Sequence, residues 1–263
     1  MDECGNYWLE DKPQRLGRGG FGEVFPVSVY DRSKRYRSEY ARKYFSPTDA
    51  NNTTYARELA DLRDRFLVEI KTQCHLNSLD YNVIAPIVLF STEGDKPYFV
   101  MELAENNLLT IIQQGMSEFD KADAIQQVLN GVELIHKNNY IHRDLNPKNI
   151  LKYSDGRYKI TDFGLVKDMD LIRAEVKTRF NPEGLGSLGY RAPEVDDSGL
   201  FSEQSDIYAV GKIISDVYGR TASRAINTVI SKSTLFFPED RYSSIDELRK
   251  DFVNAVSQVS EAV

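Results

Sequence analysis

Three short segments of the chain combine residue types that could hold a chain of phosphates and move a phosphoryl group. Residues 17–22 are rich in glycine, which lets a backbone close over phosphates without clashes from Cβ atoms. Residues 142–149 contain the carboxylate of Asp144 and the amide of Asn149, and a second carboxylate, Asp162, follows them. A positioned carboxylate can take the proton of an alcohol, and hard oxygen atoms can bind magnesium. Such groups are what transfer of a phosphoryl group to a hydroxyl would need, because that reaction depends on positioning and charge neutralisation.

The order of these segments resembles that of the protein kinase superfamily, and the resemblance covers nearly the whole sequence. It implies an α+β, bilobal protein-kinase-like fold, with a small antiparallel-sheet N-lobe that carries one regulatory helix and a larger, mainly helical C-lobe. It also implies ATP as the phosphoryl donor and Mg²⁺ as the metal. The matching motifs are G-R-G-G-F-G-E-V at 17–24, A-R-K at 41–43, H-R-D-L-N-P-K-N at 142–149, D-F-G at 162–164 and A-P-E at 192–194.

The length of 263 residues leaves room for one two-lobed domain and little beyond it. We expect a single protein kinase domain over residues 1–263. Its N-lobe would cover residues 1–103, the hinge would lie at about 102–107, and the C-lobe would cover residues 108–263.

Hydrophobic periodicity predicts the main elements. Alternating residues predict antiparallel strands within 14–45, and two further strands at 84–91 and 98–103. Apolar residues at helical spacing predict a long helix over residues 54–76. A sheet-rich part therefore precedes a part in which the helical period dominates.

Two residues carry local expectations of their own. Pro26 lacks the backbone N–H that a central strand uses, so we expect an edge position or a bulge there. Asp120 precedes a run of apolar residues at helical spacing and is expected to cap that helix.

The family resemblance assigns a nucleotide-binding role to residues of the N-lobe. Lys43 would reach the α- and β-phosphates, and a carboxylate partner would hold it in place. Glu69 fits the family's pattern on the regulatory helix, and Glu58 is the rival partner. The other residues implied at the ATP site are Leu16, Gly17, Gly19, Gly22, Val24, Ala41, Met101, Glu102 and Ala104.

The resemblance also assigns the catalytic groups. Asp144 would orient the acceptor hydroxyl and accept its proton, while Asn149 and Asp162 would hold magnesium. Serine/threonine kinases usually carry a lysine where this chain has Asn146. We expect Lys148 to supply the missing positive charge near the γ-phosphate, since a flexible amine can reach the same oxygen from a neighbouring position.

The segment 186–194, with Ser187 and Tyr190, resembles the serine/threonine form of the family. The expected activity is transfer to serine or threonine hydroxyls of protein substrates, with autophosphorylation. Three alternatives stay open: a pseudokinase-like binding scaffold, a dual-specificity or tyrosine kinase as Lys148 suggests, and a small-molecule kinase of the antibiotic-modifying sort.

Several further residues have supporting roles by resemblance. Ser187 would bond near the catalytic aspartate, Glu194 would pair with Arg241, and Asp206 would brace the catalytic loop from a buried helix. Arg143 goes with activation by phosphorylation in the family.

The phosphate-bearing residue could be Thr178. A fixed carboxylate, Glu183, could instead order the loop between Asp162 and Glu194. The ordering would be only partial, because the carboxylate carries about one negative charge where phosphate carries about 1.5 to 2. Lys167 matches a basic residue that contacts such a phosphate.

Composition narrows the partners and the compartment. The formal net charge of −7 argues against nucleic acid or an anionic membrane as the main partner. Two cysteines, no signal-peptide pattern and no long apolar run favour a soluble protein of the cytoplasm. Nothing in the sequence indicates an oligomeric state.

Overall fold

The computed structural model describes residues 1–19, 22–47, 55–94, 96–168, 187 and 189–260. The chain divides into two compact units, Met1–Glu105 and Asn106–Val263. The boundary between the units falls between Glu105 and Asn106, and the lobe and hinge bounds given above stay predictions.

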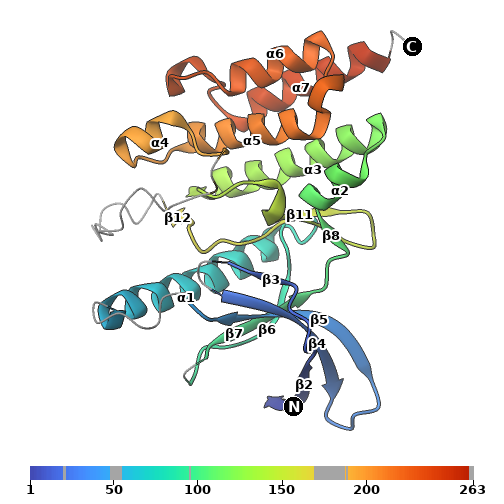
Figure 1. Ribbon diagram of the computed structural model, residues 1–263, viewed down its shortest axis with the longest axis vertical. Helices are drawn as coiled ribbons and strands as arrows, with labels where there is room; N and C mark the ends of the chain where they lie inside the picture. The colour runs from blue at the N-terminus through green and yellow to red at the C-terminus, as the bar shows by residue number, and fades with distance from the viewer. Residues whose placement is uncertain (20–21, 48–54, 95, 169–186, 188, 261–263) are drawn as a thin grey trace. The chain divides into compact units, whose positions relative to one another are not determined.

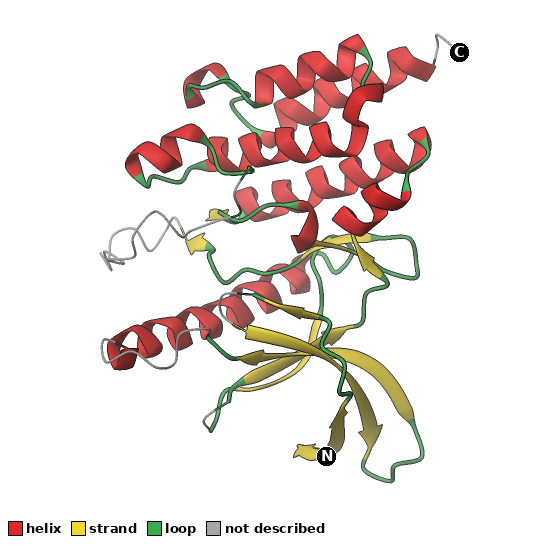
Figure 2. Cartoon of the chain, in the orientation of Figure 1, coloured by secondary structure: helices red, strands yellow, loops and turns green. Residues whose placement is uncertain are grey.

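The first unit is built on one antiparallel sheet (Figure 1). The strand order is β1-β2-β4-β5-β7-β6, and β3 also pairs with β4. One long helix, α1, accompanies this sheet, as the colours of Figure 2 show. The elements are β1 (Asp2–Cys4), β2 (Tyr7–Asp11), β3 (Gly17–Arg18), β4 (Gly22–Asp31), β5 (Arg37–Phe45), α1 (Tyr55–Leu79), β6 (Ile87–Ser91) and β7 (Tyr98–Glu102).

Helix α1 packs through aromatic side chains that the strand alternation directs to one face of the sheet. Phe66 of α1 lies between Phe45 of β5 and Phe99 of β7, with ring centroids 5.6 and 5.5 Å apart. Ile70, one helical turn further on, is buried in the same cluster. The i, i+4 spacing of Phe66 and Ile70 therefore fixes which face of the helix meets the sheet.

The position of Pro26 corrects one expectation. It lies in β4, an internal strand, and pairs with Ala41 of β5 in an unbroken register, so neither an edge nor a bulge is present. The carbonyl of Pro26 accepts a hydrogen bond from Lys12 N. The nitrogen of Pro26 points to the same side of β4 as this carbonyl. That side is the gap between β3 and β2, where no ladder donor is required.

The second unit is mainly helical, with short strands between its helices (Figure 1). Small sheets join β11, β10 and β8, and β12 with β9. Its elements are β8 (Asn106–Asn107), α2 (Leu108–Gln114), α3 (Glu118–Lys137), β9 (Tyr140–Ile141), η1 (Pro147–Asn149), β10 (Ile150–Lys152), β11 (Tyr158–Ile160), β12 (Lys167–Asp168), α4 (Pro193–Ser198), α5 (Glu203–Tyr218), η4 (Gly219–Thr221), α6 (Arg224–Ser233), η5 (Pro238–Asp240) and α7 (Ile245–Ser260).

The start of α3 corrects a second expectation. Ser117 caps this helix, because its side chain accepts the backbone N–H of Asp120. Asp120 is therefore inside the first turn, where its negative charge still interacts favourably with the helix N-terminus. The apolar side of α3 is buried as its periodicity predicted.

Close packing of α5 on α6 depends on one glycine. A Cβ atom at Gly211 would lie 2.5 Å from Cβ of Ser233, closer than real contacts allow.

The expected fold class is confirmed: an antiparallel-sheet unit with one long helix, followed by a mainly helical unit. Within the described ranges, no helix combines the length and apolar character needed to cross a membrane.

Candidate active site

A buried ion pair joins Lys43 and Glu69 in the first unit. Nζ of Lys43 lies 2.6 Å from Oε1 of Glu69, and the two side chains are 9% and 1% exposed. Strand alternation puts Lys43 on the face of β5 that meets α1, and α1 presents Glu69 beside the buried Ile70. The side chain of the rival, Glu58, lies outside the described residues. Removing either partner would leave a charge without compensation in a buried place.

The glycine segment forms a tight approach between two strands. A Cβ atom at Gly22 would lie 2.2 Å from the carbonyl oxygen of Tyr44, so only glycine fits there. Gly19 N donates to Gly22 O at 2.9 Å, and Gly17 pairs with Val24 across β3 and β4. The intervening residues 20–21 are outside the described part of the chain.

The other residues assigned to the ATP site belong to the same unit and lie on neighbouring strands or next to their ends. In the register, Val24 stands opposite Lys43 and Ala41 stands opposite Met101. Ala41 and Met101 are buried in the cluster that includes Phe66. The remaining members are Leu16, whose N–H donates to Val24 O, Glu102 at the end of β7, and Ala104 just beyond it.

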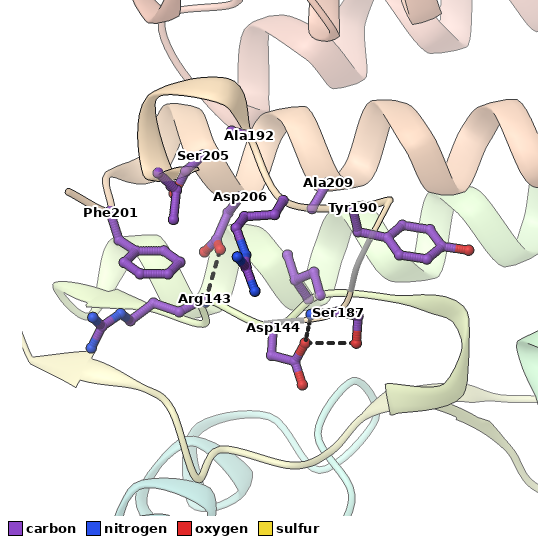
Figure 3. Close-up of a pocket in the computed structure, with 12 residues that line it drawn as sticks. Arg143, Asp144, Ser187, Tyr190, Ala192, Phe201, Ser205, Asp206 and Ala209 are labelled. Carbon is purple, nitrogen blue, oxygen red and sulfur yellow. Dashed lines mark hydrogen bonds between the residues drawn. The ribbon is translucent and has the colours of Figure 1, made fainter. Parts of the chain in front are cut away.

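In the second unit, the carboxylate of Asp144 is held by hydrogen bonds to both oxygens. Oδ1 accepts from the backbone N–H of Ser187 at 2.8 Å and from its hydroxyl at 2.9 Å (Figure 3). Oδ2 accepts from Nδ2 of Asn149 at 3.1 Å. The expected contact of Ser187 with this carboxylate is confirmed. Its two donors leave Oδ2 as the less occupied oxygen.

Burial, and next the negative charge of Asp162, raise the pKa of Asp144 above its ordinary value. The hydrogen bonds from Ser187 act in the opposite direction. Backbone strain marks the same place, because Arg143 and Asp162 have φ angles of 71° and 66°. Non-glycine residues rarely adopt such angles, and they tend to gather at functional sites.

Asp206 at the start of α5 braces the loop that carries Asp144, as expected. Its Oδ2 accepts the backbone N–H of His142 at 2.8 Å, and its Oδ1 accepts that of Arg143 at 3.0 Å. Nε2 of His136 lies 3.0 Å from the same carboxylate. Burial alone would raise the pKa of Asp206, but the hydrogen bonds and attraction from the two histidines lower it below its ordinary value.

We expect Asp206→Asn to lower the free energy of unfolding by about 2–4 kcal/mol at pH 7, because the charge-assisted hydrogen bonds are lost. The pKa of Asp206 is lower in the folded state than its ordinary value of 3.8. Its contribution is therefore present above about pH 4 and lost as the pH falls further. Urea unfolding at several pH values should show the difference from wild type shrinking below pH 4. The exposed Asp197→Asn is the control, and a difference that stays constant down to pH 3 would contradict this account.

Asn149 and Asp162 are suited to magnesium. Nδ2 of Asn149 donates to Asp144, and no hydrogen bond among the described residues uses its Oδ1. That amide oxygen and the Asp162 carboxylate would be two hard ligands. The described residues include no cluster of three or more His, Cys, Asp or Glu able to hold a metal. Two protein ligands fit magnesium, which keeps several waters and binds substrate phosphates.

The side chains of the remaining predicted residues form no hydrogen bond with Asp144 or lie outside the described residues. Lys148 is exposed, and within the described ranges its amine forms no hydrogen bond or ion pair. Arg143 stacks over Phe201, with its guanidinium carbon 4.2 Å from the ring centroid. Thr178 and Glu183, as well as the side chain of Lys167, lie outside the described part of the chain.

Two residues near the catalytic loop were not predicted from the sequence. His136 supports Asp206, and Asn146 contacts both Asp144 and Ser187. A signal for His136 was available, because it follows Val132 by four residues on the buried side of α3 and a buried imidazole needs a partner. The contacts of Asn146 reach 41 residues along the chain, which no local pattern indicates.

The structure combines a sheet-bearing unit that has a buried lysine–glutamate pair with a helical unit that has an aspartate–asparagine loop. These are the features of the protein kinase class. The chain matches the protein kinase domain over residues 11–255. It therefore belongs to the protein kinase domain family.

Named relatives are consistent with this membership. The chain is 27% identical to a LEAF RUST 10 disease-resistance locus receptor-like protein kinase-like protein of Arabidopsis thaliana, covering 94% of this chain and 36% of the relative. It is 28% identical to a G-type lectin S-receptor-like serine/threonine-protein kinase of the same plant, covering 92% and 29%. It is 27% identical to myosin light chain kinase A of Dictyostelium discoideum, covering 91% and 78%. The chain thus spans about a third of the plant relatives and most of the Dictyostelium kinase.

Proposed function

We propose that this chain transfers the γ-phosphoryl group of ATP to serine or threonine hydroxyls of protein substrates, and also to its own. The carboxylate of Asp144 carries this proposal. Its Oδ1 is occupied by Ser187, its Oδ2 is less occupied, and the two oxygen ligands suited to magnesium, Asn149 and Asp162, follow it in the chain. The serine/threonine names of relatives support the choice of acceptor.

In the proposed reaction, Oδ2 of Asp144 accepts the proton of the acceptor alcohol as the alcohol oxygen bonds to the γ-phosphorus. The bond from that phosphorus to the bridging oxygen breaks, and ADP leaves with the electron pair. Lys43, held by Glu69, and the backbone of the glycine segment bind the nucleotide phosphates. Asn149 and Asp162 would hold Mg²⁺, which neutralises charge on the phosphates when bound.

The test is incubation with radiolabelled ATP and Mg²⁺, alone and with a general protein substrate, followed by phosphoamino-acid analysis. Phosphoserine or phosphothreonine is expected. Phosphotyrosine alone would favour the tyrosine-kinase alternative, and label on a small molecule only would favour a small-molecule kinase. Nucleotide binding without any transfer would indicate a pseudokinase-like scaffold.

Lys148 is proposed to place its amine near the γ-phosphate in place of the lysine that the family carries at position 146. We expect Lys148→Ala to lower kcat about 10-fold, since one charge on a transferring phosphoryl group is removed. Initial rates should be compared with those of Lys250→Ala, an exposed lysine on α7. Equal activity of the two variants would reject this role for Lys148.

Proteins with serine or threonine acceptors are the proposed partners, rather than nucleic acid or membrane. A cytoplasmic location and the roles of Thr178 and Glu183 stay predictions.

A further inference from the structure

Asn146 is more than a neutral replacement for a lysine, because every polar atom of its side chain is engaged. The residue is 3% exposed. Nδ2 donates to the carbonyl oxygen of Asp144 at 3.0 Å and to the hydroxyl of Ser187 at 3.0 Å. It also lies 3.4 Å from Oδ1 of Asp144, and Oδ1 of Asn146 accepts the backbone N–H of Lys148 at 2.9 Å.

These contacts fix the orientation of the amide. Turning it by 180° would place the NH₂ group against the N–H of Lys148 and the oxygen against the carbonyl of Asp144. Both arrangements are repulsive, so only one orientation satisfies the donors and acceptors present.

The fixed amide in turn fixes the hydroxyl of Ser187. A hydroxyl has one proton and accepts through its lone pairs. Asn146 can only donate to Ser187 Oγ through Nδ2, so the Ser187 proton points to Oδ1 of Asp144, at 2.9 Å. With the backbone N–H of Ser187 on the same oxygen, Oδ1 is occupied and Oδ2 is available for chemistry.

We propose that Asn146 is a positioning residue that acts through the hydroxyl of Ser187 to hold Asp144 with Oδ2 as the proton-accepting oxygen. This inference rests on the proposed phosphoryl transfer. Loss of the Asn146 amide frees the Ser187 hydroxyl to rotate and lets the Asp144 carboxylate turn, so that fewer encounters with the acceptor alcohol are productive.

The simpler explanation is that Asn146 only caps the short helix η1. Serine and aspartate cap as well as asparagine, which provides matched variants. Asn146→Ser keeps the capping oxygen but is too short to donate to Ser187. Asn146→Asp keeps both the cap and the size, and replaces the donor by an acceptor. A capping role alone predicts nearly normal kinetics for Asn146→Ser, the variant that adds no charge beside Oδ1 of Asp144.

The experiment measures kcat, the KM for ATP and the thermal unfolding midpoint of wild type, Asn146→Ser, Asn146→Asp, Ser187→Ala and the double variant Asn146→Ser with Ser187→Ala. We expect kcat to fall about 10- to 100-fold in both Asn146 variants, while the KM for ATP changes less than about threefold. In the Ser187→Ala background, Asn146→Ser should lower kcat by less than about twofold, because the two residues act in one chain of contacts.

Two results would overturn the inference while leaving the proposed function intact: an active wild type with unchanged kcat in Asn146→Ser or Asn146→Asp, or full additivity in the double variant. A wild type that transfers no phosphoryl group would overturn the proposed function, and this inference with it. The unfolding midpoint decides whether a low rate reflects a misfolded protein. If Asn146→Ser is unstable, an unchanged kcat in Asn146→Asp would still overturn the inference.

Discussion

Asp144→Asn is expected to lower kcat by about 10²- to 10⁴-fold, the contribution that a positioned general base makes to proton transfer. The substitution keeps the size of the side chain and an oxygen that can accept from Ser187. It removes the oxygen that would take the alcohol proton, and it brings an NH₂ group toward Nδ2 of Asn149, which lies 3.1 Å from Oδ2. Steady-state kinetics with saturating ATP and a protein substrate would measure the change.

The control for this loss is Asp155→Asn, which removes one negative charge from an exposed turn of the same unit. Its side chain accepts the backbone N–H of Arg157, which asparagine can also do, and it forms an exposed ion pair with Nε of the same arginine at 3.3 Å. We expect normal kcat for the control and an unchanged Kd for ATP in both variants. A kcat within about threefold of wild type for Asp144→Asn would contradict the role of general base.

Motif order was enough to predict the fold and the main contacts of the candidate site. Lys43 and Glu69 meet, Asp206 supports the catalytic loop and Ser187 contacts Asp144, because each follows from a residue type at a family spacing. The helix 54–76 was predicted to within a few residues of α1, since its apolar period is strong.

The errors have a common physical cause. The expectation for Pro26 considered only the strand that contains it. A proline is accepted at this position because the pairing of β3 with β4 ends before it and the pairing of β2 with β4 begins after it. Asp120 and Ser117 both have capping side chains, and only the course of the chain selects Ser117. In each case the sequence indicates which hydrogen bonds a residue can form. Contacts between segments far apart in the sequence determine which partner actually lies beside it.

The same limit explains why the sequence comparison treated Asn146 only as the loss of a lysine. Local comparison shows only that a positive charge is missing, whereas the structure supplies Ser187 as a second partner from a segment far along the chain. Nonlocal partners of this kind set the geometry of Asp144 and its neighbours. Their replacement therefore tests the site as directly as replacement of the carboxylate itself.

A large effect on stability is expected at Arg241, whose pairing with Glu194 is confirmed. All five N–H donors of its fully buried guanidinium are satisfied. Nη1 and Nη2 bond the two oxygens of Glu194 at 2.8 and 2.7 Å. The other three bonds go to the backbone carbonyls of Leu235, Phe236 and Gln204. One side chain thus joins α4, α5 and the segment before η5.

Arg241→Met keeps much of the side-chain volume but leaves the Glu194 carboxylate and three carbonyls without this donor. We expect the free energy of unfolding to fall by about 3–5 kcal/mol and the unfolding midpoint by about 10 °C. The exposed Arg220→Met should change stability by less than about 0.5 kcal/mol. Glu194→Gln should cost about 1–3 kcal/mol, because Arg241 keeps its bonds to the carbonyls. Chemical and thermal unfolding followed by circular dichroism would rank the three variants. If Arg241→Met were no less stable than Glu194→Gln, the bonds to the carbonyls would contribute little. The ion pair with Glu194 alone would then account for the stabilising effect of Arg241.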